Sequence, residues 1–407
     1  MNVSEVTKGV YLLSVNVEDI LFEELWEIPN GVSLNSYIVK GEKTAIIDGV
    51  CGWDGTPEML FELLDKMQVK AEDIDYLVVN HAEPDHSGWI EDFKKITSDF
   101  EIICSKRGAN LISAFYGYKD NVRAVSTGET LDLGDGKTLE FLEIPNVHWP
   151  DTMITFDRET GTAFTCDAFG SFGRAGDRNF DDMLSEEEIL FFEKEAERYY
   201  ANIVATFSMP VIMAIEKSAN LPIKIVAPGH GIVWRKDAQR IIDDYRRYAG
   251  YQKGPAKEEI TLIYGSMYGM TKKAVDEAIK VLENSEIAFN VFQVPETSIG
   301  TILASAWTST GIIIASPAYE SKMFPPMAST VDELGRKKVL NRKVVMFGSY
   351  GWSKGALKEL KEINDRMRMN WDIIDSIEFN GSPDDNAMEN VKSAVSTLIN
   401  SVREAVK

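Results

Sequence analysis

The residues of this chain most able to do chemistry are its four histidines, because each follows a strand-like run. Two of them lie in HAEPDHSG (81–88), directly after the apolar run DIDYLVVN. That segment holds four possible metal ligands within six residues: His81, Glu83, Asp85 and His86. The other candidates are His148 after TLEFLEIP, Asp167 after TAFTC and His230 after IKIVAP. Because strand ends can meet at one edge of a sheet sandwich, we expect these side chains to gather there.

The types of these side chains indicate a site for two metals. Three to four imidazoles with two or three carboxylates exceed the ligand set of one tetrahedral metal. One carboxylate would then bridge the pair, and Asp167 is the natural bridge because it stands alone between the other segments. A histidine and carboxylate set without thiolate suits iron, and it also accommodates zinc or manganese.

A structural interpretation of the same residues stands beside this one. A single histidine at a strand end is more often a hydrogen-bonded structural residue, and acidic residues beside Pro and Gly are usually turn formers. For His148 or His230 alone we would favour that interpretation. The segment from His81 to His86 favours a functional site, because loops rich in histidine and acids have few structural uses.

Composition limits the classes of function that the chain can have. Its 407 residues predict two or three domains, and its net charge of −21 disfavours a general nucleic-acid-binding role. We expect no membrane segment and no signal peptide. The three cysteines form no CxxC pair and fit a reducing cytoplasm: Cys51, Cys104 and Cys166.

Residues 1–253 are predicted to form the domain that positions the candidate ligands. SLNSYIVK and KTAIIDGV read as a hairpin, as do the two halves of TMITFDRETGTAFTCD. A capping box at Ser185 and Glu188 predicts a helix to about Asn202. The mixture predicts sheets with helices packed outside, and GYQKGPAKEE (250–259) reads as a linker.

Residues 254–407 show regular alternation of strand-like and helical runs. The strands are EITLIYG, AFNVFQV, TGIIIAS, RKVVMFGS and WDIIDSIEF, and a last helix begins near Asp385. This rhythm predicts a doubly wound parallel sheet of strand order 2-1-3-4-5, with its ligand at the carboxyl ends of the strands.

Three loops of this second domain predict a site for a planar heterocycle with a phosphate. The loop GSMYGMT (265–271) offers hydroxyls and amides at a helix start, and it is neither a dinucleotide fingerprint nor a P-loop. Two later strand ends supply aromatic rings able to stack on a ring system. The candidate residues are Ser266, Met267, Tyr268, Gly269, Met270, Thr271, Ser316, Pro317, Ala318, Tyr319, Glu320, Ser349, Tyr350, Gly351 and Trp352.

The motifs resemble those of known families. HAEPDHSG resembles the signature of the metallo-β-lactamase superfamily, whose hydrolytic members usually carry His where this chain has Glu83. With HWPDTM (148–153), CDAFG (166–170) and APGHG (227–231), it resembles the flavodiiron proteins. The resemblance implies an N-terminal metallo-β-lactamase-like αββα sandwich followed by a flavodoxin-like domain that binds FMN.

The same resemblance implies roles for the seven candidate ligands around two iron ions, Fe2+ or Fe3+. It assigns His81, Glu83 and His148 to one iron. It assigns Asp85, His86 and His230 to the other, with Asp167 as the bridge. Replacing His by Glu adds negative charge, which favours iron and stabilises its oxidised state.

The implied activity is reduction of O2 by an oxidoreductase, with NO as the second candidate substrate. The resemblance implies a head-to-tail homodimer or a dimer of dimers, in which the FMN of one subunit faces the irons of the other. The chain looks most like the methanogen members, which oxidise reduced coenzyme F-420 and form water. Arg174 and Arg178 are candidates for contacts with this anionic deazaflavin, although exposed loop arginines are usually structural.

Two other functions stay open from the sequence. A rubredoxin-dependent NO or O2 reductase would need a small redox protein as its donor. A zinc hydrolase fused to a flavodoxin-like carrier is the alternative from another class, and Glu83 disfavours it.

Overall fold

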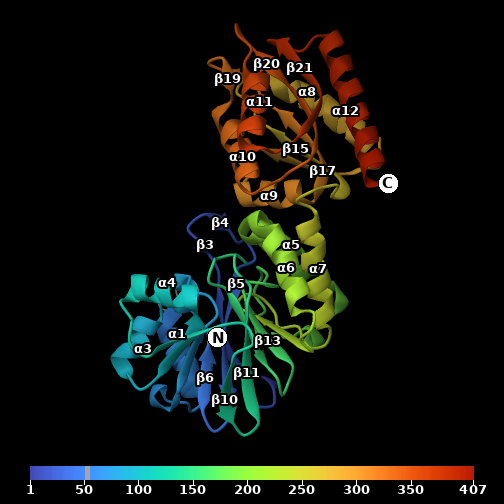
Figure 1. The fold of residues 1–407 in the computed structure, drawn as a ribbon. Coiled ribbons are helices and arrows are strands. Elements are labelled where there is room, and N and C mark those ends of the chain that lie inside the picture. Colours follow the sequence, from blue (N-terminus) through green and yellow to red (C-terminus); the bar gives the residue numbers. More distant parts are fainter. Residues whose placement is uncertain (51–55) are drawn as a thin grey trace. The chain divides into compact units, whose positions relative to one another are not determined.

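The computed structural model describes residues 1–50 and 56–407 and divides into two compact units, residues 1–246 and 247–407 (Figure 1). Cys51 lies outside the described residues, and Cys104 and Cys166 are buried free thiols. The predicted domain boundary after Lys253 stays a prediction. Among the described residues, no helix has the length and apolar character needed to cross a membrane.

The first unit contains a mixed sheet of seven strands. Its order is β1-β2-β5-β6-β7-β8-β9, antiparallel from β1 to β6 and parallel from β6 to β9. The strands are β1 (Asn2–Thr7), β2 (Val10–Val17), β5 (Val32–Lys40), β6 (Thr44–Ile47), β7 (Tyr76–Val79), β8 (Glu101–Ser105) and β9 (Val122–Val125). A short hairpin, β3 (Leu21–Phe22) with β4 (Trp26–Glu27), stands apart from this sheet.

A second sheet of five strands faces the first. Its order is β10-β11-β12-β13-β14, antiparallel except for the parallel pair β13 and β14. The strands are β10 (Thr130–Gly134), β11 (Lys137–Glu143), β12 (Met153–Asp157), β13 (Thr162–Cys166) and β14 (Ile225–Pro228). One core cluster takes side chains from both sheets, such as Val39 and Ile103 from the first and Phe141 and Phe164 from the second. Burial of these apolar faces therefore holds the sandwich together.

Helices cover the sandwich, as the sequence predicts. Helices α1 and α4 contact strands of the seven-stranded sheet, and α5, α6 and α7 lie on the side of the other sheet (Figure 1). The helices are α1 (Thr56–Lys66), α2 (Pro84–Ser87), α3 (Ile90–Ile96), α4 (Lys106–Tyr116), α5 (Glu186–Tyr199), α6 (Ser208–Ser218) and α7 (Ala238–Gly250). Short helical turns are η1 (Ala71–Asp73), η2 (Asp181–Met183), η3 (Tyr200–Val204) and η4 (Ala205–Phe207).

The local predictions for the first unit are confirmed. The two hairpins are β5 with β6 and β12 with β13. At the start of α5, the Glu188 N–H donates to Ser185 Oγ, and the Ser185 N–H donates to Glu188 Oε2. Helix α5 ends at Tyr199, slightly earlier than expected, because the chain continues as the π-helical turn η3.

The second unit is a parallel sheet of five strands in the order β16-β15-β17-β20-β21, which is the predicted order 2-1-3-4-5. The strands are β15 (Lys257–Tyr264), β16 (Ala288–Gln293), β17 (Ser309–Ala315), β20 (Lys343–Tyr350) and β21 (Asp372–Asn380). A small hairpin joins β18 (Ala318–Tyr319) to β19 (Lys322–Met323). The helices are α8 (Met270–Glu283), α9 (Ile299–Thr308), α10 (Pro325–Arg336), α11 (Ala356–Met367) and α12 (Asp385–Val406).

The segment predicted as a linker is shorter in the structure. Helix α7 continues through Gly250, and β15 begins at Lys257, so residues 251–256 alone lie between them. Lys257 pairs with Ser309 and Glu259 with Ala288, which extends the parallel ladder into a charged sequence. The charge of KEE suggested a loop, but backbone pairing at the start of a strand tolerates exposed charged side chains.

Candidate metal centre and aromatic cavity

The seven predicted ligands come together beyond the carboxyl ends of strands of the first unit. Strand β7 ends at Val79, two residues before His81, and α2 follows with Pro84 at its first position. Asp167 follows the last residue of β13, and His230 comes two residues after the end of β14. The sandwich therefore places side chains from four distant segments at one edge, as predicted.

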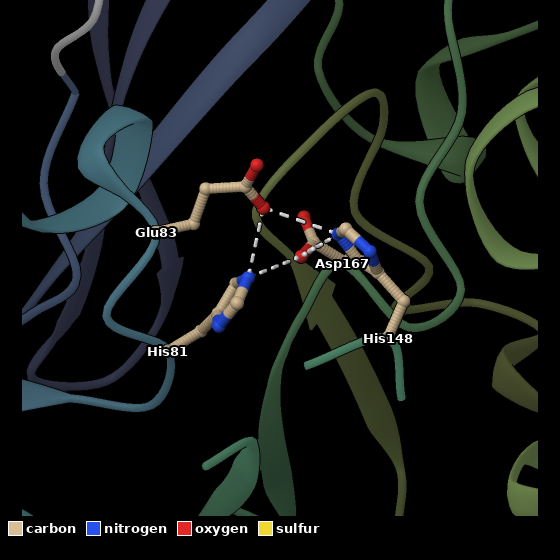
Figure 2. Close-up of side chains that lie close together, drawn as sticks. All are labelled: His81, Glu83, His148 and Asp167. Carbon is tan, nitrogen blue, oxygen red and sulfur yellow. Dashed lines mark hydrogen bonds and ion pairs between the residues drawn. The ribbon is translucent and has the colours of Figure 1, made fainter. Parts of the chain in front are cut away.

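The first group contains two imidazoles and two carboxylates. His81 Nε2 lies 3.0 Å from Glu83 Oε2 and 3.2 Å from Asp167 Oδ2. His148 Nε2 lies 3.1 Å from the same Glu83 oxygen and 3.3 Å from the same Asp167 oxygen. Figure 2 shows these four side chains turned toward one another. They surround a common point.

The second group repeats this arrangement with the remaining ligands. His86 Nε2 and His230 Nε2 each lie 3.5 Å from Asp85 Oδ2. They lie 3.0 and 3.1 Å from Asp167 Oδ1. The two carboxylate oxygens of Asp167 therefore face different groups, Oδ2 the first and Oδ1 the second. This is the geometry that a bridging carboxylate requires.

The donor set fits two cations. Two atoms bound to one metal at about 2.0–2.2 Å lie about 3.0–3.5 Å from each other, which is the range of the separations above. The four histidines and Asp167 are buried, with Asp167 only 2% exposed. Among the residues that the structure describes, Asp167 Oδ2, Asp85 Oδ1 and His230 Nε2 have no hydrogen-bond partner. Because unpaired buried polar atoms are costly, this pattern fits atoms that hold metal ions.

The neighbouring imidazoles lower the pKa of Glu83 and of Asp167 against the effect of burial, which keeps these two carboxylates ionised. Burial alone would raise the pKa of Glu83, but hydrogen bonds from His148 and His81 lower it to about 2. Burial would likewise lower the pKa of His81, yet hydrogen bonds to Asp151 and Glu83 raise it to about 10. Neighbouring carboxylates raise the pKa of His86, His148 and His230 to about 9 against the effect of burial. Without metal, protons on the imidazoles therefore balance the carboxylates.

The loop that carries His230 is held from strand β5. The Asn35 side-chain amide donates to Pro228 O at 3.1 Å and to Gly231 O at 2.9 Å, on either side of His230. The Tyr37 hydroxyl also donates to Pro228 O, at 2.7 Å. Asn35 is buried, and its own oxygen accepts from Ser14. The sheet thus fixes where this imidazole stands.

Sequence reasoning missed two residues at this site. The Tyr199 hydroxyl donates to Asp167 Oδ1 at 3.1 Å from helix α5, and no local sequence signal marks it because the contact depends on tertiary packing. Asp151 faces His81 Nδ1 at 3.4 Å. Its signal was present in HWPDTM, where an acidic residue lies three positions after a candidate ligand.

The second unit contains a cavity of about 380 Å³ at the carboxyl ends of β15, β17 and β20. Tyr268 and Trp352 line it and are 85% and 86% exposed. The lining residues are Met267, Tyr268, Met270, Pro317, Ala318, Tyr319, Glu320, Ser349, Tyr350, Gly351, Trp352 and Gly381. All but Gly381 belong to the predicted flavin set. Aromatic walls at the start of α8 fit a planar heterocycle with an anionic tail.

Four predicted flavin residues lie in the same loops but do not line this cavity. Ser266 Oγ accepts from the Gly269 N–H, and Thr271 Oγ1 lies 3.0 Å from Ser349 Oγ. Ser316 is buried. Gly269 has a φ of +84°, a left-handed conformation that glycine adopts without strain just before α8. These four residues shape the loops around the cavity.

The two arginines considered for the deazaflavin are paired with carboxylates. Arg174 lies 2.7 Å from Glu18, and Arg178 forms an ion pair with Glu188. Both guanidinium groups are exposed. These contacts favour the structural interpretation of both residues.

Comparisons with known proteins agree with this architecture. A family model described as ODP family beta lactamase matches residues 32–231. An anaerobic nitric oxide reductase flavorubredoxin of Vibrio vulnificus is 33% identical over 341 residues, which cover 82% of this chain and 67% of that protein.

Solved structures cover the whole chain. A mutant flavo di-iron protein from Thermotoga maritima is 31% identical, with a TM-score of 0.88 over 98% of both chains. A rubredoxin oxygen:oxidoreductase from Desulfovibrio gigas has a TM-score of 0.92 over 100% of both chains at 24% identity. This second likeness concerns the fold alone. The predicted fold, a metallo-β-lactamase-like sandwich followed by a flavodoxin-like sheet, is confirmed.

Proposed function

We propose, from the premise that this chain belongs to the flavodiiron proteins, that it reduces O2 to water at a pair of irons with electrons delivered through FMN. The observation that carries this proposal is Asp167, whose two oxygens face two separate groups of ligand atoms at 3.0 to 3.3 Å. Glu83 disfavours the zinc hydrolase considered from the sequence, because hydrolytic members of the metallo-β-lactamase superfamily usually carry His at this position.

The proposed ligand roles follow the two groups. His81, Glu83 and His148 would hold one iron, Asp85, His86 and His230 the other, and Asp167 would bridge them. When bound, two ferrous ions and a reduced FMN together supply the four electrons that reduction of O2 to two waters requires. Glu83 and Asp85 are the half-buried members of the set, so they lie on its more open side.

The protein's own residues would keep this centre in place. Burial of the imidazoles excludes bulk water from their ring nitrogens, which strengthens their interactions with charge. The Tyr199 hydroxyl donates to Asp167 Oδ1 and so stabilises the ionised, bridging form of this carboxylate. Asn35 holds the loop of His230.

FMN is proposed for the cavity of the second unit. Its aromatic lining, with Tyr319 and Trp352, supplies rings for stacking on the flavin. The start of α8, beside Ser266 and Thr271, suits the phosphate. The very exposed Trp352 and Tyr268 fit a cavity that another protein surface covers.

We propose a head-to-tail homodimer, or a dimer of two such dimers, as the working form. The family resemblance supports this arrangement, in which the FMN of one subunit serves the irons of the other. Such an assembly has two equivalent reaction centres related by a twofold axis.

Reduced coenzyme F-420 is the proposed electron donor, on the resemblance to the methanogen members. A rubredoxin is the second candidate, and NO is the second candidate substrate. One observation favours both alternatives: the Vibrio vulnificus relative, 33% identical, is named an anaerobic nitric oxide reductase flavorubredoxin.

The test begins with iron, zinc and FMN content of the protein purified without added metal, for which we expect two irons and one FMN per chain. Stopped-flow mixing of the reduced protein with O2 or NO then compares the two gases. Parallel assays with reduced F-420 and reduced rubredoxin compare the donors. Zinc in place of iron, or no reoxidation by either gas, would contradict the proposed function.

A further inference from the structure

We propose that Asp151 is a positioning residue that makes the two irons electronically unequal by accepting a hydrogen bond from the rear nitrogen of His81. This inference rests on the proposed function. Asp151 is not among the seven proposed ligands, and its carboxylate lies behind His81, away from the atoms that face the metal position.

The rear nitrogen of His81 and one carboxylate oxygen of Asp151 face each other in a buried position. His81 Nε2 faces Glu83 and Asp167, while His81 Nδ1 faces Asp151 Oδ1 at 3.4 Å. Among the described residues neither His81 Nδ1 nor Asp151 Oδ1 has a hydrogen-bond partner, and the two atoms face each other as an ion-pair contact at 3.4 Å. His81 is 0% exposed and Asp151 2%, so water does not compete for this contact.

The other oxygen of Asp151 is already fixed. Asp151 Oδ2 accepts from the Ala82 N–H at 2.7 Å, and the Ser105 hydroxyl donates to Asp151 O at 2.8 Å. The carboxylate is therefore held against the loop that carries His81 and Glu83. Asp151 also lies three residues after His148, so it joins both histidine-bearing loops of the first group.

A carboxylate behind a candidate histidine ligand occurs at one of the two iron positions among the described residues. Across residues 1–50 and 56–407, no carboxylate lies within ion-pair distance of Nδ1 of His86, His148 or His230. The contacts of these three rings with acids all involve Nε2. His230 Nδ1 has no hydrogen-bond partner among the described residues.

A carboxylate behind a ligating imidazole fixes the tautomer and the ring orientation, and it raises the basicity of the ligating nitrogen. With Nε2 toward the metal, Nδ1 carries the proton and donates it to Asp151. A more basic ligand stabilises the ferric over the ferrous ion. The iron held by His81 therefore has the lower reduction potential and is the first of the two to be oxidised.

The test is a redox titration of the FMN- and iron-loaded full chain, followed by electron paramagnetic resonance of the half-reduced iron pair. Asp151→Asn removes the charge and keeps the shape of the side chain. We expect one of the two iron steps to shift to a more positive potential, with the other step and the flavin steps unchanged. Iron affinity at one position should also fall about 10–100-fold.

Asp181→Asn is the matched control. Asp181 is also buried, and it accepts backbone N–H groups of Arg235, Lys236 and Asp237 without touching a candidate ligand. Its variant should leave both iron steps in place. If Asp151→Asn does not fold, Asp151→Glu keeps the charge but displaces it, and the same step should shift less.

Unshifted iron potentials in a folded Asp151 variant with both irons bound would overturn the inference. Equal shifts of both steps would also overturn it, because the contact lies at one position only. A protein that never binds two irons would instead contradict the proposed function, so the two failures are distinguishable.

Discussion

At the scale of single residues, Asp167 is the side chain on which the two-metal interpretation depends. Asp167→Ala removes the oxygens that face both ligand groups, so we expect loss of both irons. FMN should stay bound because the cavity proposed for it belongs to the other unit. Metal and flavin analysis of the purified variant measures both.

Asp181→Asn is the control for this change as well, since it removes the charge of another buried carboxylate, 4% exposed against 2% for Asp167, that accepts from backbone N–H groups and touches no candidate ligand. Full iron content and full turnover in Asp167→Ala would show that the bridging role is wrong.

The protonation of the four imidazoles gives a second prediction at this scale. Their pKa values are raised to about 9 or 10 in the metal-free cluster, so they carry protons at pH 7. A metal can bind only to the deprotonated nitrogens. Iron binding at pH 7 should therefore release protons, and the apparent affinity should rise with pH until the imidazoles lose their protons unaided.

Anaerobic titration of the metal-free protein with Fe2+ in weakly buffered solution, with a pH indicator, measures this release. Binding of two irons without any proton release at pH 7 would contradict the arrangement of imidazoles and carboxylates described above.

At the scale of elements, the strand ends could be predicted because the residues that form them are strongly patterned. Apolar runs such as those before His81 and His230 end where polar ligands begin, and the parallel strands then bring those ends together. The contacts of Tyr199 and Asp151 could not be predicted in this way, since each depends on how a helix or a loop packs against another segment.

The Asn35 side chain on strand β5 holds the loop that carries His230, and a substitution tests this contact. Asn35→Ala leaves Gly231 O without its donor and weakens the hold on Pro228 O, where Tyr37 still donates. We expect a loss of about 1–3 kcal/mol in the free energy of unfolding. Because the His230 loop then keeps only its backbone contacts with β5 and the Tyr37 hydrogen bond, iron at its position should also be lost more readily to a chelator.

Urea unfolding and the rate of iron release to a chelator measure the two effects. Asn290→Ala is the control, because the Asn290 side chain is exposed and donates to Ser305 Oγ in the second unit, where it touches no candidate ligand. If Asn35→Ala released iron no faster than the Asn290 variant does, strand β5 would not support the His230 loop in the way proposed.

At the scale of the whole molecule, the order of the two domains followed from the sequence, because a change from hairpins to regular β-α alternation marks each of them. The predicted linker, residues 250–259, is longer than the segment that lies between α7 and β15 in the structure. The charged residues at the start of β15 have the composition of a linker, so the sequence did not separate the two. The pairing of two subunits could not be predicted from residue patterns, because it depends on contacts between surfaces of separate chains.

Complementation tests the proposed head-to-tail dimer. Asp167→Ala is expected to keep FMN and lose iron, and Trp352→Ala to keep iron and weaken FMN binding by losing a stacking surface. Each variant alone should be nearly inactive. Coexpression forms mixed dimers in which the FMN of the first variant serves the irons of the second, so gas consumption should return.

Absence of any recovered turnover in isolated mixed dimers, with the expected iron and FMN present, would contradict this arrangement. Size-exclusion chromatography with light scattering identifies the mixed species and its mass.

Mössbauer spectroscopy of the protein loaded with iron-57 tests the central claim most directly. Two ligand groups that share Asp167 predict two iron signals in equal amounts, magnetically coupled through the bridge in the oxidised state. A single magnetically isolated iron, or two irons without coupling, would contradict it.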